Sequence, residues 1–253
     1  MITFPDDVKA AYSRSKNIIR KTPLDHSPSL SNIIDGDVYL KLDNIQKTGS
    51  FKFRGAISKM TSLNEKQRKK GVVTASTGNH GAAVSLGMKI LGINGSIIVP
   101  ENIAPNKVEN INNLGGTVEY YGNDCLEAEQ RAQEISVTTG AIYISPYNDP
   151  VIVAGQGTMG VELDEDLSNI DTVIVAVGGG GLISGIGGYL KTVQPKVEMV
   201  GCSPKNSCVM YESLQAGRIL DLPSKPTLSD GTAGGIEENS ITFEICKKII
   251  SDF

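Results

Sequence analysis

Short runs of β-branched and apolar residues alternate with longer segments of helical periodicity along most of the chain. A parallel strand pair needs a crossover connection of a dozen or more residues, usually a helix, so this alternation predicts parallel sheets with helices on both faces. The expected strands are 38–41, 72–75, 96–99, 117–121, 142–145, 172–177 and 197–201. The expected helices are 79–91, 104–114, 126–137, 151–167, 182–192 and 207–216.

The expected elements fall into two groups, which predicts an α/β fold of two lobes, each an open parallel twisted sheet flanked by helices. Residues 71–148 form the smaller lobe, and residues 1–70 with 149–253 form the larger one, to which 1–70 contributes a strand and a helix. Residues 241–253 have the pattern of a helix, and no strand follows it. We therefore expect that the C-terminal part of the larger lobe is missing from this sequence or is supplied by another chain.

The charge pattern excludes several classes of partner. The chain has a formal net charge of −4, and its longest basic run is Arg68-Lys69-Lys70. That run is too short for a nucleic-acid or anionic membrane surface. Residues 172–190 carry no charge but hold seven glycines, which favours a buried strand and loop over a membrane span. Acidic residues near the N-terminus argue against a signal peptide, so we expect a cytoplasmic protein.

Glycine is over-represented, with 28 residues among 253, and four glycines stand together at Gly178, Gly179, Gly180 and Gly181. They follow the most hydrophobic expected strand and precede a helix. Backbone N–H groups at such a junction converge on an anion, and the helix dipole adds to the attraction, so we interpret this loop as a phosphate site. A tight turn without a ligand is the alternative. The spacing 178–185, with Glu198, also fits a dinucleotide fingerprint loosely.

A second strand-to-helix junction, 75–81, is rich in small polar residues and reads Ala-Ser-Thr-Gly-Asn-His-Gly. Hydroxyl, amide and free backbone N–H groups at a helix N-terminus suit a carboxylate or a phosphate. The alternative is an ordinary helix cap, because Ser, Thr and Asn are good capping residues.

A third segment, 43–56, places Lys52 between Phe51 and Phe53. A lysine in apolar surroundings loses its charge more readily, and the neutral amine is the form that condenses with a carbonyl group. The alternative is a surface lysine whose stem lies over the two rings. The spacing alone does not distinguish the two.

These three segments stand in the same order as in the pyridoxal-phosphate enzymes of the serine/threonine dehydratase group, which the sequence resembles. That group includes serine racemase and has the tryptophan-synthase-β fold, known as fold type II. The resemblance extends to residues 147–150, 154–158 and 230–233 and so covers nearly the whole chain. The residue sequences of segments 75–81 and 229–235 are most similar to those of dehydratases associated with hydroxyectoine use.

The resemblance implies a role for each matching residue. Lys52 matches the lysine that binds pyridoxal 5'-phosphate covalently and later moves the substrate α-proton. Asn79 matches the asparagine that hydrogen-bonds the ring hydroxyl of the cofactor. Thr77 stands where racemases of the group have a serine that handles the proton on the opposite face. The loop that holds the cofactor phosphate matches Gly178, Gly179, Gly180, Gly181 and Leu182. The loop that grips the substrate carboxylate matches Ser76, Thr77, Asn79 and His80.

The sequence departs from the group at two places. Metal-stimulated members have two acidic residues where this chain has Ser203 and Val209, so we expect no divalent metal there. Members also continue for several dozen residues and supply a Ser, or a similar residue, that bonds the pyridine nitrogen. This sequence ends at Phe253, before the matching segment.

The expected function is β-elimination, in which a small β-hydroxy amino acid such as threonine or serine yields a 2-oxo acid and ammonia. A serine racemase-like activity and a hydroxy-amino-acid lyase of hydroxyectoine use are the alternatives within the group. A non-catalytic nucleotide-binding domain, or an inactive truncated fragment, is the alternative of another class. The expected partners are a small amino-acid substrate and a second copy of the chain in a homodimer, with no nucleic acid and no membrane.

Overall fold

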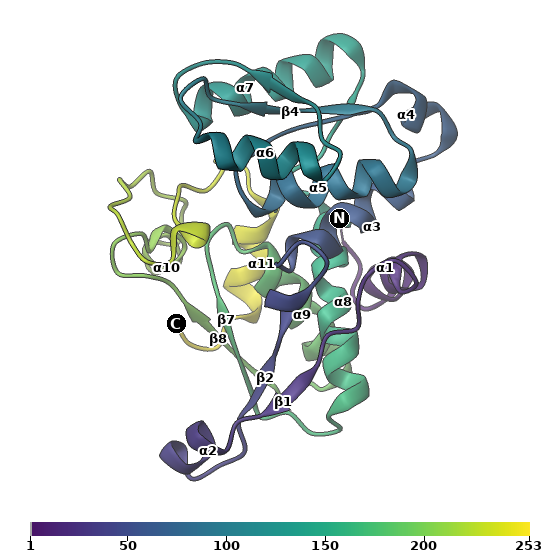
Figure 1. Ribbon diagram of the computed structural model, residues 1–253. Coiled ribbons are helices and arrows are strands. Elements are labelled where there is room, and N and C mark those ends of the chain that lie inside the picture. The colour runs from purple at the N-terminus through teal and green to yellow at the C-terminus, as the bar shows by residue number, and fades with distance from the viewer. Residues whose placement is uncertain (1) are drawn as a thin grey trace.

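The computed structural model describes residues 2–253 and contains a four-stranded parallel sheet in its upper part (Figure 1). The strand order is β5-β4-β3-β6, with Val72 of β3 opposite Gly95 of β4 and Ile142 of β6. The strands are β3 (Val72–Ala75), β4 (Gly95–Val99), β5 (Val118–Tyr120) and β6 (Ile142–Tyr143). They lie within one or two residues of the expected strand ends, because each is a short β-branched run next to turn residues.

Helices cover both faces of this sheet, as predicted. Successive strand residues point to opposite faces, so Val73 packs in a cluster with α7 residues while Val72 packs in one with α5 and α3 residues. The helices of this region are α3 (Lys52–Ser62), α4 (Glu65–Lys70), α5 (Asn79–Leu91), α6 (Pro105–Asn113) and α7 (Cys125–Thr139).

A second parallel pair, β7 (Thr172–Ala176) and β8 (Glu198–Cys202), lies lower in the view (Figure 1). Val175 and Met199 are buried on one side of the pair, whereas Ile174 on the other side is 72% exposed. For the described residues the prediction of helices on both faces is therefore wrong for this pair. The helices of this region are α8 (Pro150–Asp166), α9 (Gly181–Val193), α10 (Val209–Ala216) and α11 (Ile241–Ile249), with a short 3-10 turn, η2 (Asp230–Thr232).

The N-terminal region differs most from the prediction. Its two strands pair antiparallel, with Leu24 opposite Lys41, where only parallel sheets were expected. It also holds more elements than one strand and one helix before α3 begins. Three-residue strands and a seven-residue helix without buried residues leave little periodicity in the sequence. The elements are α1 (Asp6–Ser15), β1 (Leu24–His26), α2 (Pro28–Ile34), β2 (Tyr39–Lys41) and the 3-10 turn η1 (Asp43–Ile45).

The last helix is shorter than predicted. α11 ends at Ile249, and Ile250 has extended backbone angles. Asp252 then forms a parallel bridge with Val200 of β8, so the residues after α11 run alongside that strand and do not continue the helix. Across residues 2–253, none of the helices combines the length and the apolar character that crossing a membrane requires.

Glycines allow α8 to pack closely against a helix on either side. A Cβ atom on Gly155 would lie 2.8 Å from the Cα atom of Gly55 in α3. A Cβ atom on Gly157 would lie 2.8 Å from the carbonyl oxygen of Gly185 in α9. Real Cβ atoms do not approach so closely, so only glycine lets these backbones meet. α8 thereby holds α3, which begins at Lys52, at a fixed short distance from α9, which begins at the glycine loop.

Candidate functional site

The short segment 144–147 between β6 and α8 contacts all three of the segments that the sequence singles out. Lys52, the first residue of α3, donates a hydrogen bond from its Nζ atom to the carbonyl oxygen of Pro146 at 2.8 Å. Lys52 and Pro146 are 94 residues apart in the chain. The Nζ atom also lies 5.4 Å from the centroid of the Phe51 ring. The lysine is therefore aimed at a defined place inside the fold and does not extend into solvent.

The glycine loop meets the same segment at Tyr147. A Cβ atom on Gly179 would lie 2.6 Å from carbon atoms of the Tyr147 ring, so the ring lies directly against the loop. Gly180 has a φ of +80°, in the left-handed region that favours glycine. Among the described residues, the backbone N–H groups of 178–182 donate to no protein acceptor. They lie at the N-terminus of α9 and are available to an anion.

The third segment reaches 144–147 through His80. Its Nε2 atom lies 2.9 Å from the carbonyl oxygen of Ile144, and the ring is buried. Burial, with a smaller effect of the charge on Lys52, lowers the pKa of His80 to about 3. The neutral ring must then carry its proton on Nε2, because a carbonyl oxygen only accepts. His80 therefore anchors the start of α5 to the segment that carries Pro146 and Tyr147.

The other polar residues of this junction remain more open. Asn79 is exposed, and Ser76 and Thr77 are partly buried. The Ser76 hydroxyl accepts a hydrogen bond from the N–H group of Gly78 at 3.2 Å. Gly78, the N-cap of α5, makes no side-chain cap hydrogen bond, so the first N–H groups of α5 are free for a ligand.

Two residues that the sequence did not indicate, Glu237 and Thr242, hold the end of this segment and the glycine loop in place. Asn148 donates from its Nδ2 atom to the Glu237 carboxylate at 2.6 Å and accepts from the N–H group of Ile241 at 2.9 Å. The Tyr147 hydroxyl accepts from the N–H group of Glu237 at 2.8 Å. Thr242 adds a hydrogen bond to the carbonyl oxygen of Gly179 at 2.6 Å. Residues 147 and 148 belong to a sequence motif, whereas no local pattern marks Glu237 or Thr242.

The environment of Lys52 changes the acidity of its amine. Burial lowers the pKa of Lys52 to about 8, because the charged form is poorly solvated there. Nearly half of the molecules then carry a neutral, nucleophilic amine at a pH just below 8. His80, whose pKa is lowered by burial and further by the charge on Lys52, stays neutral throughout that range.

This acidity predicts a pH dependence for the attachment of an aldehyde to Lys52. The neutral amine is the reactive form, so the attachment rate should rise up to about pH 8 and level off above it. A lysine with an ordinary pKa near 10.4 would keep gaining about tenfold per pH unit up to pH 10. Stopped-flow absorbance with pyridoxal phosphate, from pH 6 to pH 10.5, measures the profile. A rate that still climbs tenfold between pH 9 and pH 10 would contradict it.

No cation site is evident around these loops. In the range 2–253, no group of three or more His, Cys, Asp or Glu side chains is placed to hold a metal ion. The Ser203 hydroxyl donates to the carbonyl oxygen of Val177 at 2.6 Å, where β7 ends and the glycine loop begins. Ser203 therefore supports the loop through the backbone.

Comparison with known proteins identifies the family. A family model described as pyridoxal-phosphate dependent enzyme matches residues 16–253. The chain belongs to this family. The cofactor of this family is pyridoxal 5'-phosphate, which carries an aldehyde and a phosphate. The residues of this chain fit that group: Lys52 offers an amine, and the glycine loop and the start of α5 offer free N–H groups.

The chain is similar to several curated members of the family. The chain is 43% identical to an L-threonine ammonia-lyase of Thermotoga maritima, covering 100% of this chain and 62% of the relative. It is 38% identical to L-threonine dehydratase catabolic TdcB of Escherichia coli (strain K12), covering 98% and 75%. It is 38% identical to a serine racemase of Arabidopsis thaliana, covering 97% and 73%. The chain thus spans less than two thirds of the Thermotoga relative.

Solved structures agree on the fold. Maize serine racemase superposes with a TM-score of 0.92 at 34% identity, covering 98% of this chain and 74% of the other. A threonine deaminase isoform from Solanum lycopersicum gives a TM-score of 0.90 at 32% identity, covering 98% and 74%. The resemblance to the dehydratase group and the α/β fold of type II are therefore confirmed.

Proposed function

We propose that this chain is a pyridoxal-phosphate dependent ammonia-lyase that converts a small β-hydroxy amino acid, threonine or serine, into a 2-oxo acid and ammonia. The observation that carries the proposal is that Lys52, the glycine loop and the start of α5 all contact segment 144–147. Those three parts supply a nucleophilic amine and two anion-binding helix ends. The threonine ammonia-lyase and dehydratase activities of the relatives support the choice of reaction.

The residues have distinct places in this proposal. With the cofactor bound, Lys52 would hold its aldehyde and Asn79 would hydrogen-bond its ring hydroxyl. The cofactor phosphate would be held by the free N–H groups of Gly178, Gly179, Gly180, Gly181 and Leu182. The substrate carboxylate lies at the start of α5, within reach of Ser76, Thr77, Asn79 and His80. His80 contributes there as a neutral anchor of the helix, because its Nε2 atom is already bonded to Ile144.

The chemistry divides between the cofactor and the chain. Pyridoxal phosphate, when bound, supplies an electron sink that stabilises a negative charge at the substrate α-carbon. The chain binds and orients the substrate so that its α-hydrogen faces the Lys52 amine. Once the substrate amine has replaced it on the cofactor, the Lys52 amine is free and would take that proton as a base, and its lowered pKa of about 8 keeps it partly neutral near physiological pH. Loss of the β-hydroxyl as water and later addition of water release ammonia and the 2-oxo acid.

The direct test is product analysis. The chain with pyridoxal phosphate should release ammonia and 2-oxobutyrate from L-threonine, or ammonia and pyruvate from L-serine, in equal amounts. Formation of D-serine without pyruvate would favour the racemase alternative. A melting temperature raised by NAD or ATP, but not by pyridoxal phosphate, would favour the nucleotide-binding alternative.

Thr77 gives a test of elimination against racemisation. Its hydroxyl stands at the start of α5 with an extra methyl group beside it, which restricts how it can approach the second face of the substrate. Thr77→Ser should raise the ratio of D-serine to pyruvate. The upper limit of the increase is about 10²-fold, which is the rate gain that a well-placed proton donor contributes. Chiral chromatography of the products measures the ratio. Thr192→Ser in α9 is the matched control, and an unchanged ratio in both variants contradicts the role of Thr77.

Three further expectations belong to this proposal. The small domain comprises 71–148, and the large domain comprises 1–70 with 149–253.

The chain acts in the cytoplasm as a homodimer on a small amino acid. Light scattering after size-exclusion chromatography measures the mass, and a value of one 26.9 kDa chain would contradict the dimer.

A further inference from the structure

We propose that Arg54 is the positioning residue for Lys52: together with Asp43 and Glu162, it sets the rotation of the first turn of α3 and thereby aims the Lys52 amine at the carbonyl oxygen of Pro146. The inference rests on the proposed role of Lys52. The inference adds Arg54, a buried residue, to the residues that form the candidate site.

The Arg54 side chain is fully buried and is held on all of its nitrogen atoms. Its Nε and Nη2 atoms donate to the two oxygens of Asp43 at 2.8 and 2.7 Å. Its Nη1 and Nη2 atoms donate to the two oxygens of Glu162 at 2.6 and 3.0 Å. Weaker hydrogen bonds reach the hydroxyls of Thr158 and Thr22, both at 3.3 Å. Charge-assisted bonds of this forked kind hold orientation as well as position.

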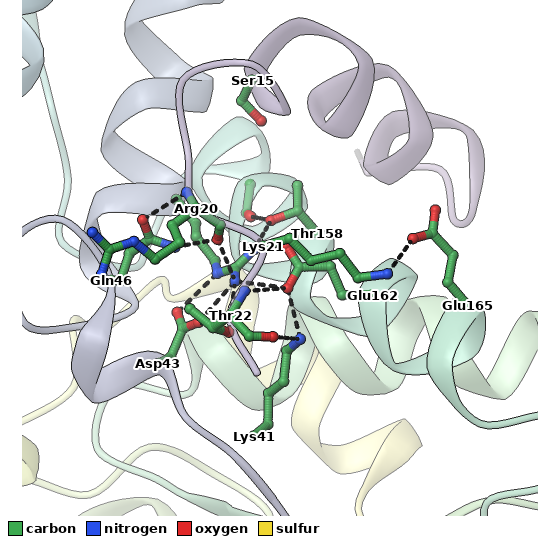
Figure 2. A network of polar contacts seen from close by, with 12 residues as sticks. Ser15, Arg20, Lys21, Thr22, Lys41, Asp43, Gln46, Thr158, Glu162 and Glu165 are labelled. Atoms are coloured by element: carbon green, nitrogen blue, oxygen red, sulfur yellow. Dashed lines mark hydrogen bonds and ion pairs between the residues drawn. The ribbon is translucent and has the colours of Figure 1, made fainter. Parts of the chain in front are cut away.

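The partners of Arg54 come from three separate parts of the fold. Asp43 opens η1, Glu162 and Thr158 lie on α8, and Thr22 lies on the segment before β1. Figure 2 shows their side chains pointing toward one another between these elements, with Lys41 beside them. The guanidinium therefore ties the first turn of α3 to three elements at once.

Helix geometry explains how this contact controls Lys52. Consecutive residues of an α-helix are about 100° apart around the axis, so Lys52 and Arg54 project about 200° apart, from nearly opposite sides. Fixing Arg54 at the back of α3 therefore fixes the direction of Lys52 at its front. The N-cap residue Phe51 makes no side-chain cap hydrogen bond, and the side-chain contact at this helix end is one long bond, from the Lys52 N–H group to the Ser50 hydroxyl at 3.3 Å. The shorter bonds of Arg54 therefore hold this turn more firmly than its cap does.

The charges in the cluster balance in pairs, and this allows a clean experiment. Lys41 forms an ion pair with Glu162 at 2.7 Å, and the two side chains are 7% and 0% exposed. Arg54 and Asp43 form the other pair at 2.7 Å. Removing Arg54 alone leaves buried carboxylates with too little positive charge, which is strongly destabilising. Removing Arg54 and Asp43 together leaves the Lys41–Glu162 pair neutral.

The test compares Arg54→Met/Asp43→Asn with the wild-type chain. Competitive labelling of lysines with acetic anhydride, read by mass spectrometry from pH 6 to pH 11, gives the pKa of Lys52 without cofactor or substrate. If α3 loses its orientation, Lys52 reaches water, and its pKa should rise by at least one unit toward the ordinary value. The rate at which pyridoxal phosphate attaches at pH 8 should fall by at least about fivefold, because a rise of one pKa unit lowers the neutral fraction of the amine from about a half to about a tenth.

Lys21→Met is the matched control, because Lys21 pairs with Glu165 and Asp166 in the same region but is 48% exposed. In this control variant, the labelling of Lys52 should depend on pH as it does in the wild-type chain. A folded double variant with an unchanged Lys52 profile would overturn the inference. If the double variant does not fold, Arg54→Lys decides: it keeps the charge but loses the fork, so a rise in the Lys52 pKa supports the inference and no change overturns it. The labelling is independent of the lyase assay, so the two proposals fail separately.

Discussion

Replacing Lys52 by alanine should abolish both cofactor attachment and turnover. The amine is the group aimed at Pro146 beside the glycine loop, and in the proposed reaction it is the nucleophile and the base. Removing one such group costs about 10²–10⁴-fold in rate, and removing one with two roles costs at least that much. The visible absorption band of the lysine-bound cofactor, after desalting, and the release of ammonia measure the two effects.

The control for this substitution is Lys66→Ala. Lys66 lies on α4, is exposed and has no contact with segment 144–147 in the described hydrogen bonds. This variant should keep the band and the rate of the wild type. Lys52→Ala that retains the band and releases ammonia at nearly the wild-type rate would refute the assignment of Lys52.

Gly185→Ala should cause a large loss of stability. A Cβ atom at this position would overlap the carbonyl oxygen of Val153 and lie 2.5 Å from the backbone nitrogen of Gly157. Both are backbone atoms of α8, so no side chain can move aside, and the two helices must separate. Overpacking of this kind costs about 1–3 kcal/mol or more, which lowers the melting temperature of a chain this long by about 2–12 °C.

The same substitution should also weaken cofactor binding. α9 carries the glycine loop at its N-terminus, and α8 sets its distance from α3, where Lys52 lies. Displacing α9 therefore moves the proposed phosphate site away from the amine. Gly231→Ala is the control, since a Cβ atom there meets nothing within 4 Å. Equal melting temperatures for the two variants, measured by differential scanning calorimetry, would contradict the role of the glycine contact.

Much of the fold could be predicted from the sequence where the signal is local. The bounds of β3 and α5 agree with the expected 72–75 and 79–91, because an apolar strand is followed there by polar helix-starting residues. β1 and α2 were missed because they are too short to show a period, whereas β2 lies within the expected strand 38–41 and only its antiparallel pairing was missed. The open face of β7 was missed as well. Ile174 has the character of a buried strand residue, and only the arrangement of neighbours decides that it is exposed.

The candidate site divides in the same way. The sequence by itself determined the parts: a lysine between two aromatic residues, a run of four glycines and a polar helix start, each recognised from residue type at a junction. Only the tertiary structure decided that all three meet at 144–147, that His80 is a buried anchor, and that Glu237 and Arg54 hold the parts in place. The physical reason is the separation in sequence over which each kind of interaction acts. Local propensity acts over a few residues, whereas the contacts Lys52–Pro146 and Arg54–Glu162 join residues 94 and 108 positions apart, and they exist only once the helices have packed.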